Sequence, residues 1–246
     1  LGRIHTAQDF LDTFNEARIT GFDNINVDLI SALPNQTIDM YIKDIDNVIA
    51  LRPEHISSYS LIIEEGTPFY NNSEILDDLP SEDIAVRMYE LTNELLSNAG
   101  YNRYEISNYA RQGYESRHNS SYWELVDYIG VGLGASSCFD GRRYKNHSDV
   151  AIYINGDFHK EEDYKLEVKD IMEEYMFLGL RMMDGISCKN FHYKTGQDIY
   201  DVYGDVIEKH ISLNNLIRYE KNDNEFLKLS ENAIMISNQI FLDFML

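Results

Sequence analysis

The sequence predicts an α/β fold followed by a small, largely helical domain, and three observations lead to this prediction. Helical and strand-like patterns alternate over the first half of the chain. Strands separated by helices at this spacing pair in parallel through crossover connections, which gives an α/β barrel or an open sheet. The alternation stops near residue 150. We therefore expect one domain in residues 1–150 and a second, smaller domain in residues 151–246.

The elements of the first domain follow from hydrophobic spacing and from the residues that end each run. Gly21 ends the first helical run and Pro53 stops the second, while Ser81 is expected to cap a third helix that Gly100 closes. The predicted helices are 7–20, 38–49 and the segment after Ser81. The predicted strands are 24–30, 55–63, "YNRYEIS" and "YIGVGLGASS".

The second domain reads as helices followed by a hairpin. The segment "LEVKDIMEEYMFLGLRMMDGIS" has apolar residues on one helical face, and shorter helices are expected around 187–195 and 199–211. The tail, "LIRYEKNDNEFLKLSENAIMISNQIFLDFM", predicts two short strands around an Asn-Asp-Asn turn and then a final helix. This order is typical of a winged-helix domain.

The composition excludes several classes of protein. The chain has 21 Lys and Arg against 42 Asp and Glu, a net charge of −21, which opposes binding to the phosphates of nucleic acid. Its apolar runs are much shorter than the ~20 residues of a membrane helix. Cys138 and Cys188 are too few for a disulfide framework, so we expect a reducing, cytoplasmic location.

Candidate binding residues lie near predicted strand ends, where chemistry gathers on folds of this class. They include Asp28, the segment 62–64, Asn108 and Ser136. Asp28 either accepts hydrogen bonds from nearby backbone amides or binds ribose-type hydroxyls, and both readings stay open. The run "GVGLG" has the spacing G-x-G-x-G rather than that of a dinucleotide fingerprint, so its small residues more plausibly allow close approach of a ligand or of neighbouring backbone.

His118 is the most distinctive candidate because it lies in the polar stretch "SRHNSSYW". Its imidazole could bind a metal while Tyr122 and Trp123 flank a flat ring. The alternative, favoured by the chemistry of the residues alone, is a hydrogen-bonded loop histidine with Trp123 filling the mouth of a barrel. Arg3, taken by itself, reads as a surface residue.

Seven stretches taken together are more specific than these single residues. In chain order they are "LGRIHT", "GFDNINVDLISALPNQT", "HISSYSLIIEEGTPFY", "YEISNYARQGYESRHNSSYW", "YIGVGLGASS", "FLGLRMMDGIS" and "LSENAIMISNQIFLDFM". The set resembles the family of oxygen-independent coproporphyrinogen III oxidase-like radical S-adenosylmethionine proteins over essentially the whole chain. Within that family, "HNSSYW" resembles the H-N-x-x-Y-W signature of the heme-chaperone branch.

The resemblance implies a partial (β/α) radical-SAM-type barrel, a 4Fe-4S cluster, S-adenosylmethionine and a C-terminal helical and winged domain. The family's cluster motif, C-x3-C-x2-C, lies before the first residue of this chain. We therefore expect this chain to be the C-terminal portion of a longer protein, with no metal site of its own and no activity by itself. Its two cysteines, fifty positions apart, cannot replace three clustered thiolates.

The resemblance also assigns roles to individual residues. It implies that Arg3 meets the methionine carboxylate of S-adenosylmethionine, that Asp28 meets its ribose hydroxyls, and that Ile62 and Ser136 line the adenosine pocket. It makes His118 the axial ligand of heme iron. We assign no catalytic residue.

Four further positions bear on these roles. Arg117 and Arg111 are the nearby cations for the propionates of a heme. Two positions depart from the family pattern: Ala32 stands where the turn usually has Gly, and Ser136 stands where this branch often has His.

The function that the resemblance favours is a heme-binding chaperone that delivers heme to an acceptor, such as a respiratory protein. Any association with a membrane surface would then come through that partner. One alternative is a coproporphyrinogen III oxidase, in which a 5′-deoxyadenosyl radical starts the decarboxylation of propionates. The other is a non-catalytic α/β domain that only binds a partner.

Overall fold

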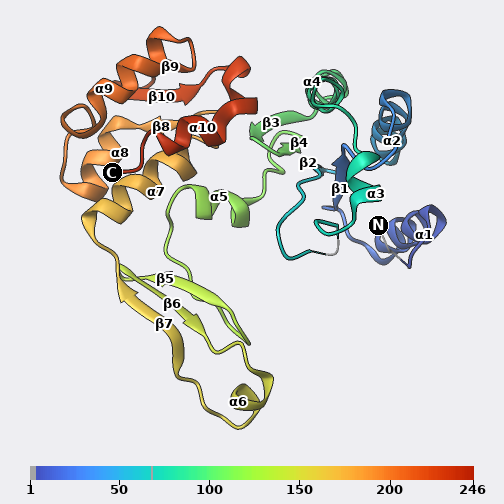
Figure 1. Ribbon diagram of the computed structural model, residues 1–246, viewed down its shortest axis with the longest axis horizontal. Helices are drawn as coiled ribbons and strands as arrows, with labels where there is room; N and C mark the ends of the chain where they lie inside the picture. The colour runs from blue at the N-terminus through green and yellow to red at the C-terminus, as the bar shows by residue number, and fades with distance from the viewer. Residues whose placement is uncertain (1–3, 68) are drawn as a thin grey trace. The chain divides into compact units, whose positions relative to one another are not determined.

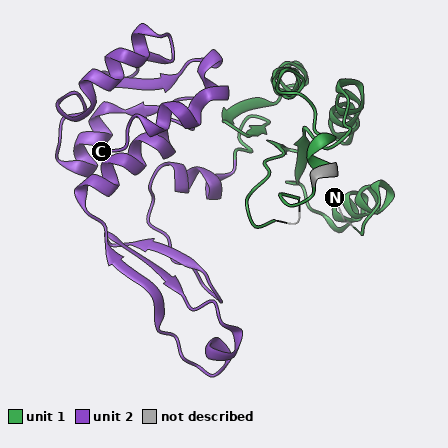
Figure 2. Cartoon of the chain, viewed as in Figure 1, with its two compact units in different colours: residues 1–115 green, residues 116–246 purple. Residues whose placement is uncertain are grey.

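The computed structural model describes residues 4–67 and 69–246, with the backbone alone at residues 73 and 74. The chain forms two compact units, residues 1–115 and 116–246 (Figure 2). The elements of the first unit are α1 (Ala7–Thr20), β1 (Asn26–Ser31), α2 (Ile38–Leu51), β2 (His55–Ser60), α3 (Ser73–Asp77), α4 (Glu82–Asn98), β3 (Asn102–Glu105) and β4 (Asn108–Ala110) (Figure 1). These elements match the predicted helices and strands of this region and add α3 and β4.

The first unit contains a four-stranded sheet in the order β1-β2-β4-β3. β1 and β2 are parallel, with Asn26 opposite His55 and Asp28 opposite Ser57. β4 is antiparallel to both of its neighbours, so β3 runs parallel to β2. The prediction of parallel strands is therefore correct for β1, β2 and β3, and the additional strand β4 is antiparallel. The reason is that β4 turns back from β3 after two residues and pairs between β3 and β2.

One face of this sheet is apolar and the other is polar. Helices α1, α2 and α4 pack on the apolar face, where the buried residues are Phe14, Val27, Tyr41, Ile45, Val48, Ile56, Met88, Leu96, Tyr101 and Tyr109. Burying each large side chain of this kind contributes about 1.5–3 kcal/mol. Because side chains alternate along a strand, Asn26 and Asp28 of β1 and His55 and Ser57 of β2 lie on the opposite face. That polar face carries the first candidate site.

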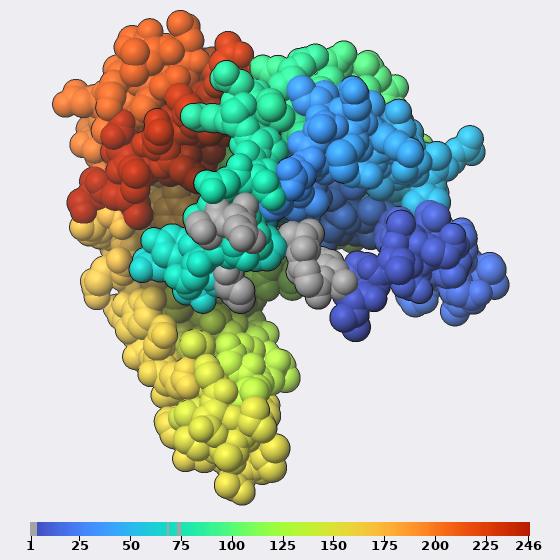
Figure 3. Space-filling model, turned by 45° about the vertical axis from the view of Figure 1, so that its right-hand side comes forward, coloured from blue at the N-terminus to red at the C-terminus, as the bar shows by residue number. Residues whose placement is uncertain are grey.

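The second unit contains two small sheets and most of the helices. Its elements are α5 (Arg117–Trp123), β5 (Ser136–Phe139), β6 (Arg142–Asn146), α6 (Val150–Ile154), β7 (Lys160–Lys165), α7 (Val168–Gly179), β8 (Ile186–Ser187), α8 (Cys188–Thr195), α9 (Ile199–Ser212), β9 (Leu216–Glu220), β10 (Glu225–Leu229), η1 (Glu231–Ile236) and α10 (Ser237–Leu242). β5, β6, β7 and α6 project as a lobe away from the helices of the same unit (Figure 3).

The winged-helix prediction for the C-terminal part is confirmed. The domain combines helices α7, α8 and α9 with a three-stranded sheet in the order β8-β10-β9. The turn between β9 and β10 is the predicted Asn-Asp-Asn turn. The rings of Phe191, Tyr203 and Phe244 pack edge to face in the core. Gly185 is required before β8, because a Cβ there would lie 2.0 Å from the carbonyl oxygen of Leu227.

The sheet β5-β6-β7 corrects the prediction for "YIGVGLGASS". Only the end of that stretch is a strand, and Tyr128 forms an isolated bridge to Cys138. Gly132 and Gly134 have positive φ, which breaks the extended run that the apolar residues suggested. β7 was missed because its sequence, "KEEDYK", is exposed throughout and has no apolar alternation.

The sheet of the first unit is open and does not close into a barrel. The structural division at residue 115 differs from the domain boundary expected at residue 150, which was drawn from the change in sequence pattern and stays a prediction. Among the described residues, every helix is too short or too polar to span a membrane.

Candidate functional site

Asp28 lies on the polar face of the first sheet. It is the third of six residues in β1, so the expectation that it lies near the end of the strand is wrong. Its side chain is exposed, and its Oδ1 accepts a hydrogen bond of 2.6 Å from Nδ2 of Asn26. A carboxylate has two oxygens with several lone pairs, so this one remains able to accept hydrogen bonds from a ligand's hydroxyl groups.

His55 holds the side chain of Asn26, which binds Asp28, in place. The sequence analysis did not identify His55 as a candidate. The imidazole is only 5% exposed. Its Nδ1 lies 2.6 Å from Oδ1 of Asn26, and its Nε2 lies 2.8 Å from the hydroxyl of Tyr104. Because Asp28 can only accept, the amide of Asn26 must turn its NH2 toward Asp28 and its oxygen toward His55. His55 therefore carries its proton on Nδ1, and Tyr104 donates to Nε2.

Burial has an electrostatic consequence for this chain of hydrogen bonds. Removing the imidazole from water lowers the pKa of His55 below its usual value, and the nearby Asp28 and Glu115 carboxylates only partly oppose this shift. The neutral ring is thus the form that the fold favours. The sequence did offer a signal for His55, because it begins a predicted strand. A buried histidine at such a position needs hydrogen-bond partners on neighbouring elements.

The other residues assigned to S-adenosylmethionine lie at separate places. Ile62 follows β2 in the first unit and is 73% exposed. Ser136 opens β5 in the second unit, where its side chain is exposed. Arg3 lies outside the described residues. Their shared role with Asp28 stays a prediction. Asn108, also expected near a strand end, opens β4 and donates to the buried carboxylate of Glu105.

His118 lies in a helix rather than in the expected loop. It is the second residue of α5, whose first turn is capped by the Ser116 hydroxyl accepting from the amide of Asn119. The sequence did not reveal this helix because none of its seven residues is buried, so it has no apolar stripe. The side chain of His118 is exposed, which leaves the imidazole accessible to a ligand.

Aromatic rings extend from His118 along one side of α5. Tyr122 is one helical turn later, and its ring centroid lies 5.0 Å from that of His118 in an edge-to-face arrangement. The ring of Tyr128 follows at 4.7 Å from Tyr122. Trp123 instead packs under the guanidinium of Arg181, 4.5 Å from the ring centre, which anchors the end of α5 to the segment after α7.

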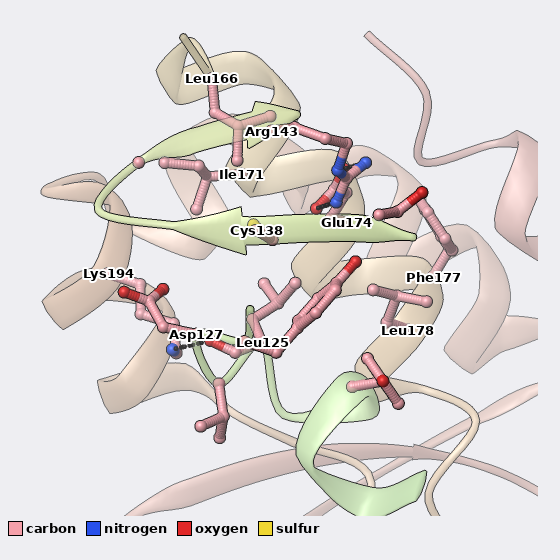
Figure 4. Close-up of a pocket in the computed structure, with 15 residues that line it drawn as sticks. Leu125, Asp127, Cys138, Arg143, Leu166, Ile171, Glu174, Phe177, Leu178 and Lys194 are labelled. Atoms are coloured by element: carbon pink, nitrogen blue, oxygen red, sulfur yellow. Dashed lines mark hydrogen bonds and ion pairs between the residues drawn. The ribbon is translucent and has the colours of Figure 1, made fainter. Parts of the chain in front are cut away.

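Tyr122 and Tyr128 also line a pocket of about 570 Å³ (Figure 4). β5 and β6 form one wall and α7 forms another, and Figure 4 shows Cys138, Ile171 and Leu178 around the same space. Arg143 and Glu174 form a two-point ion pair at one side, with N–O distances of 2.7 and 3.0 Å. This pairing holds the pKa of Arg143 above its usual value.

The described residues contain no group of three or more His, Cys, Asp or Glu side chains arranged to hold a metal ion. Cys138 on β5 and Cys188 on α8 are both free thiols. Burial, together with the nearby carboxylate of Glu225, raises the pKa of Cys188 to about 12, so this thiol stays protonated. The role of His118 as a ligand of heme iron stays a prediction.

Comparison with known proteins finds relatives along the whole chain. The model of the HemN C-terminal domain family matches residues 166–236. Heme chaperone HemW of Lactococcus lactis is 36% identical over 249 residues, which cover 100% of this chain and 65% of that protein. Heme chaperone HemW of Bacillus subtilis is 34% identical, and the alignment covers 98% of this chain and 64% of that protein.

The chain is therefore similar along its whole length to proteins named heme chaperone HemW, and its C-terminal part matches the HemN C-terminal domain family. These matches confirm the resemblance drawn from the seven ordered stretches. The chain spans about two thirds of the length of these curated relatives, 65% and 64%.

A solved structure has a similar fold. Coproporphyrinogen III oxidase (HemN) from Escherichia coli, a radical SAM enzyme, superposes with a TM-score of 0.77 over 98% of this chain and 59% of its own, at 16% sequence identity. The likeness confirms the predicted α/β class and radical-SAM-type architecture.

Proposed function

We propose that this chain is part of a heme chaperone, which binds heme through His118 and passes it to an acceptor protein. Exposure of His118 on α5 is the observation that carries the proposal, because an imidazole free of buried partners can ligate iron. The relatives named heme chaperone HemW support it, as does the "HNSSYW" stretch that forms this helix. We propose respiratory proteins as the acceptors and the cytoplasm as the location, with any membrane association made through the acceptor.

The second part of the proposal concerns S-adenosylmethionine and a 4Fe-4S cluster. The polar face around Asp28 fits a nucleoside, because an exposed carboxylate held by Asn26 can accept hydrogen bonds from ribose hydroxyls. Asp28 would orient the ribose and Ile62 would line the adenosine pocket, with Arg3 at the carboxylate. The role of Ser136, which belongs to the second unit, stays a separate prediction. Together, the two groups would supply radical chemistry to the complete protein. The cluster itself would be held by residues outside this chain, since the described residues provide no cysteine triad.

Heme titration tests the function directly. Hemin added to the complete protein is expected to give a Soret band, and His118→Ala should shift or weaken it. His192→Ala is the matched control, because His192 is also an exposed helical histidine of the second unit. A spectrum that His118→Ala leaves unchanged would remove His118 as the ligand. Robust anaerobic conversion of coproporphyrinogen III by the protein with its cluster assembled would instead establish an oxidase.

A further inference from the structure

The pocket beside α5 has the size and lining of a small-molecule site. Its volume of about 570 Å³ lies in the range of ligand pockets, which are mostly apolar with a few placed polar groups. Leu166, Ile171 and Leu178 supply apolar walls, and all lining residues belong to the second unit. A planar apolar molecule with polar groups at its margin matches this lining.

Aromatic rings in edge-to-face contact connect the pocket to His118. Tyr122 lines the pocket and also contacts the imidazole of His118, while Tyr128 contacts Tyr122 and lines the pocket as well. A macrocycle whose iron is bound by His118 extends well beyond its metal in every direction. Its edge can therefore reach past Tyr122 into the pocket, where aromatic and aliphatic side chains would bury it.

The charges in the pocket indicate where an acidic group would bind. Both terminal nitrogens of the Arg143 guanidinium are already bound to Glu174, so this cation is neutralised. Lys194 donates to the carbonyl oxygen of Leu125 at 3.1 Å. An ammonium group has three N–H donors, so Lys194 keeps donors for a carboxylate at the margin of the pocket.

We propose that this pocket holds the edge of a porphyrin macrocycle, with Lys194 pairing with one propionate. The inference rests on the proposed heme-chaperone function and adds to it a second contact region that needs no iron. Because pocket binding does not require ligation by His118, a metal-free porphyrin should bind there too. This separates the pocket from the iron ligand experimentally.

Filling the pocket mouth tests the proposal on the complete protein, with metal-free protoporphyrin IX as the probe. Val126 lines the pocket and is 49% exposed, so Val126→Trp places a bulky ring there without disturbing a core. Val168→Trp is the matched control, because Val168 is 47% exposed and lies outside the pocket lining. We expect Val126→Trp to weaken porphyrin binding about tenfold or more, measured by porphyrin fluorescence, and Val168→Trp to leave it unchanged.

The outcomes separate the pocket from the function. Weakened porphyrin binding in Val126→Trp supports the pocket, whether or not His118→Ala changes the hemin spectrum. Failure of His118→Ala to alter that spectrum would count against the iron ligand alone. Equal porphyrin binding by Val126→Trp and Val168→Trp, or no porphyrin binding by the unaltered protein, would overturn the pocket.

The role of Lys194 has its own control. Lys194→Gln should weaken binding of protoporphyrin IX about three- to tenfold, because one charge-assisted hydrogen bond is lost. It should leave binding of the dimethyl ester, which has no free carboxylate, unchanged. An equal loss for the acid and the ester would show that Lys194 contributes packing rather than a charge.

Discussion

His55 gives the sharpest prediction about the polar face of the first sheet. His55→Phe keeps an aromatic ring but removes both ring nitrogens, which bond to Asn26 and Tyr104. A buried group that loses its partner costs about 1–3 kcal/mol. Asn26 is exposed and Tyr104 is half-buried, so water can replace part of the lost bonding. We therefore expect the free energy of unfolding to fall by about 1–2 kcal/mol at neutral pH.

The pH dependence of this change follows from the lowered pKa of His55. In the unfolded chain the imidazole binds a proton below about pH 6.5, whereas the folded chain resists protonation. The stability of the unaltered protein is therefore complete above that pH. It declines as the pH falls below it, by at most about 1.4 kcal/mol per pH unit from this group. His55→Phe lacks this decline, so the difference between the two proteins should shrink as the solution is acidified.

Urea denaturation at about pH 8 and about pH 5.5 measures this difference. Far-UV circular dichroism is the suitable signal, because the single tryptophan, Trp123, reports on the second unit. Tyr104→Phe is the control: it removes one hydrogen bond and keeps the imidazole, so the pH dependence should persist. A constant difference between the unaltered protein and His55→Phe at both pH values would refute the assigned state of His55.

Two other predictions concern the second unit. Gly185→Ala should lower stability by about 3 kcal/mol or more, because the new Cβ would meet the carbonyl of Leu227, whereas Gly196→Ala, with positive φ but open space, should cost only about 1–2 kcal/mol. Thermal unfolding of both variants checks this, and equal losses would contradict it. Glu174→Gln should lower the free energy of unfolding by about 1–3 kcal/mol, because Glu174 is only 8% exposed. The loss stays in this range because its partner Arg143 is partly solvated. No change in denaturant midpoint would show that the pair adds nothing.

Local signals explain why much of the fold was predictable. The helices ending at Gly21 and before Pro53 have clear 3.6-residue spacing, and both lie within one or two residues of their predicted bounds. Where the local signal was weak, the prediction failed. α5 buries none of its residues, and the charged β7 shows no alternation, so neither has a pattern that marks an element.

The candidate residues divide in the same way. His118 and Asp28 were singled out from the local sequence, and the resemblance to one family gave them their predicted roles. The predicted loop around His118 and the predicted strand end near Asp28 were both wrong. His55 was missed because its importance comes from Asn26 and Tyr104. These partners lie 29 and 49 positions away in the sequence.

The amino-acid sequence by itself determined the α/β class, the winged C-terminal part and the likeness to the HemW proteins, because these depend on spacing and residue type along the chain. Tertiary structure decided the open sheet with β4 between β2 and β3, the buried neutral His55, and the pocket beside Tyr122. Each of these depends on residues that are distant in sequence meeting in space. Hydrogen bonds, desolvation and cavities arise only from such contacts.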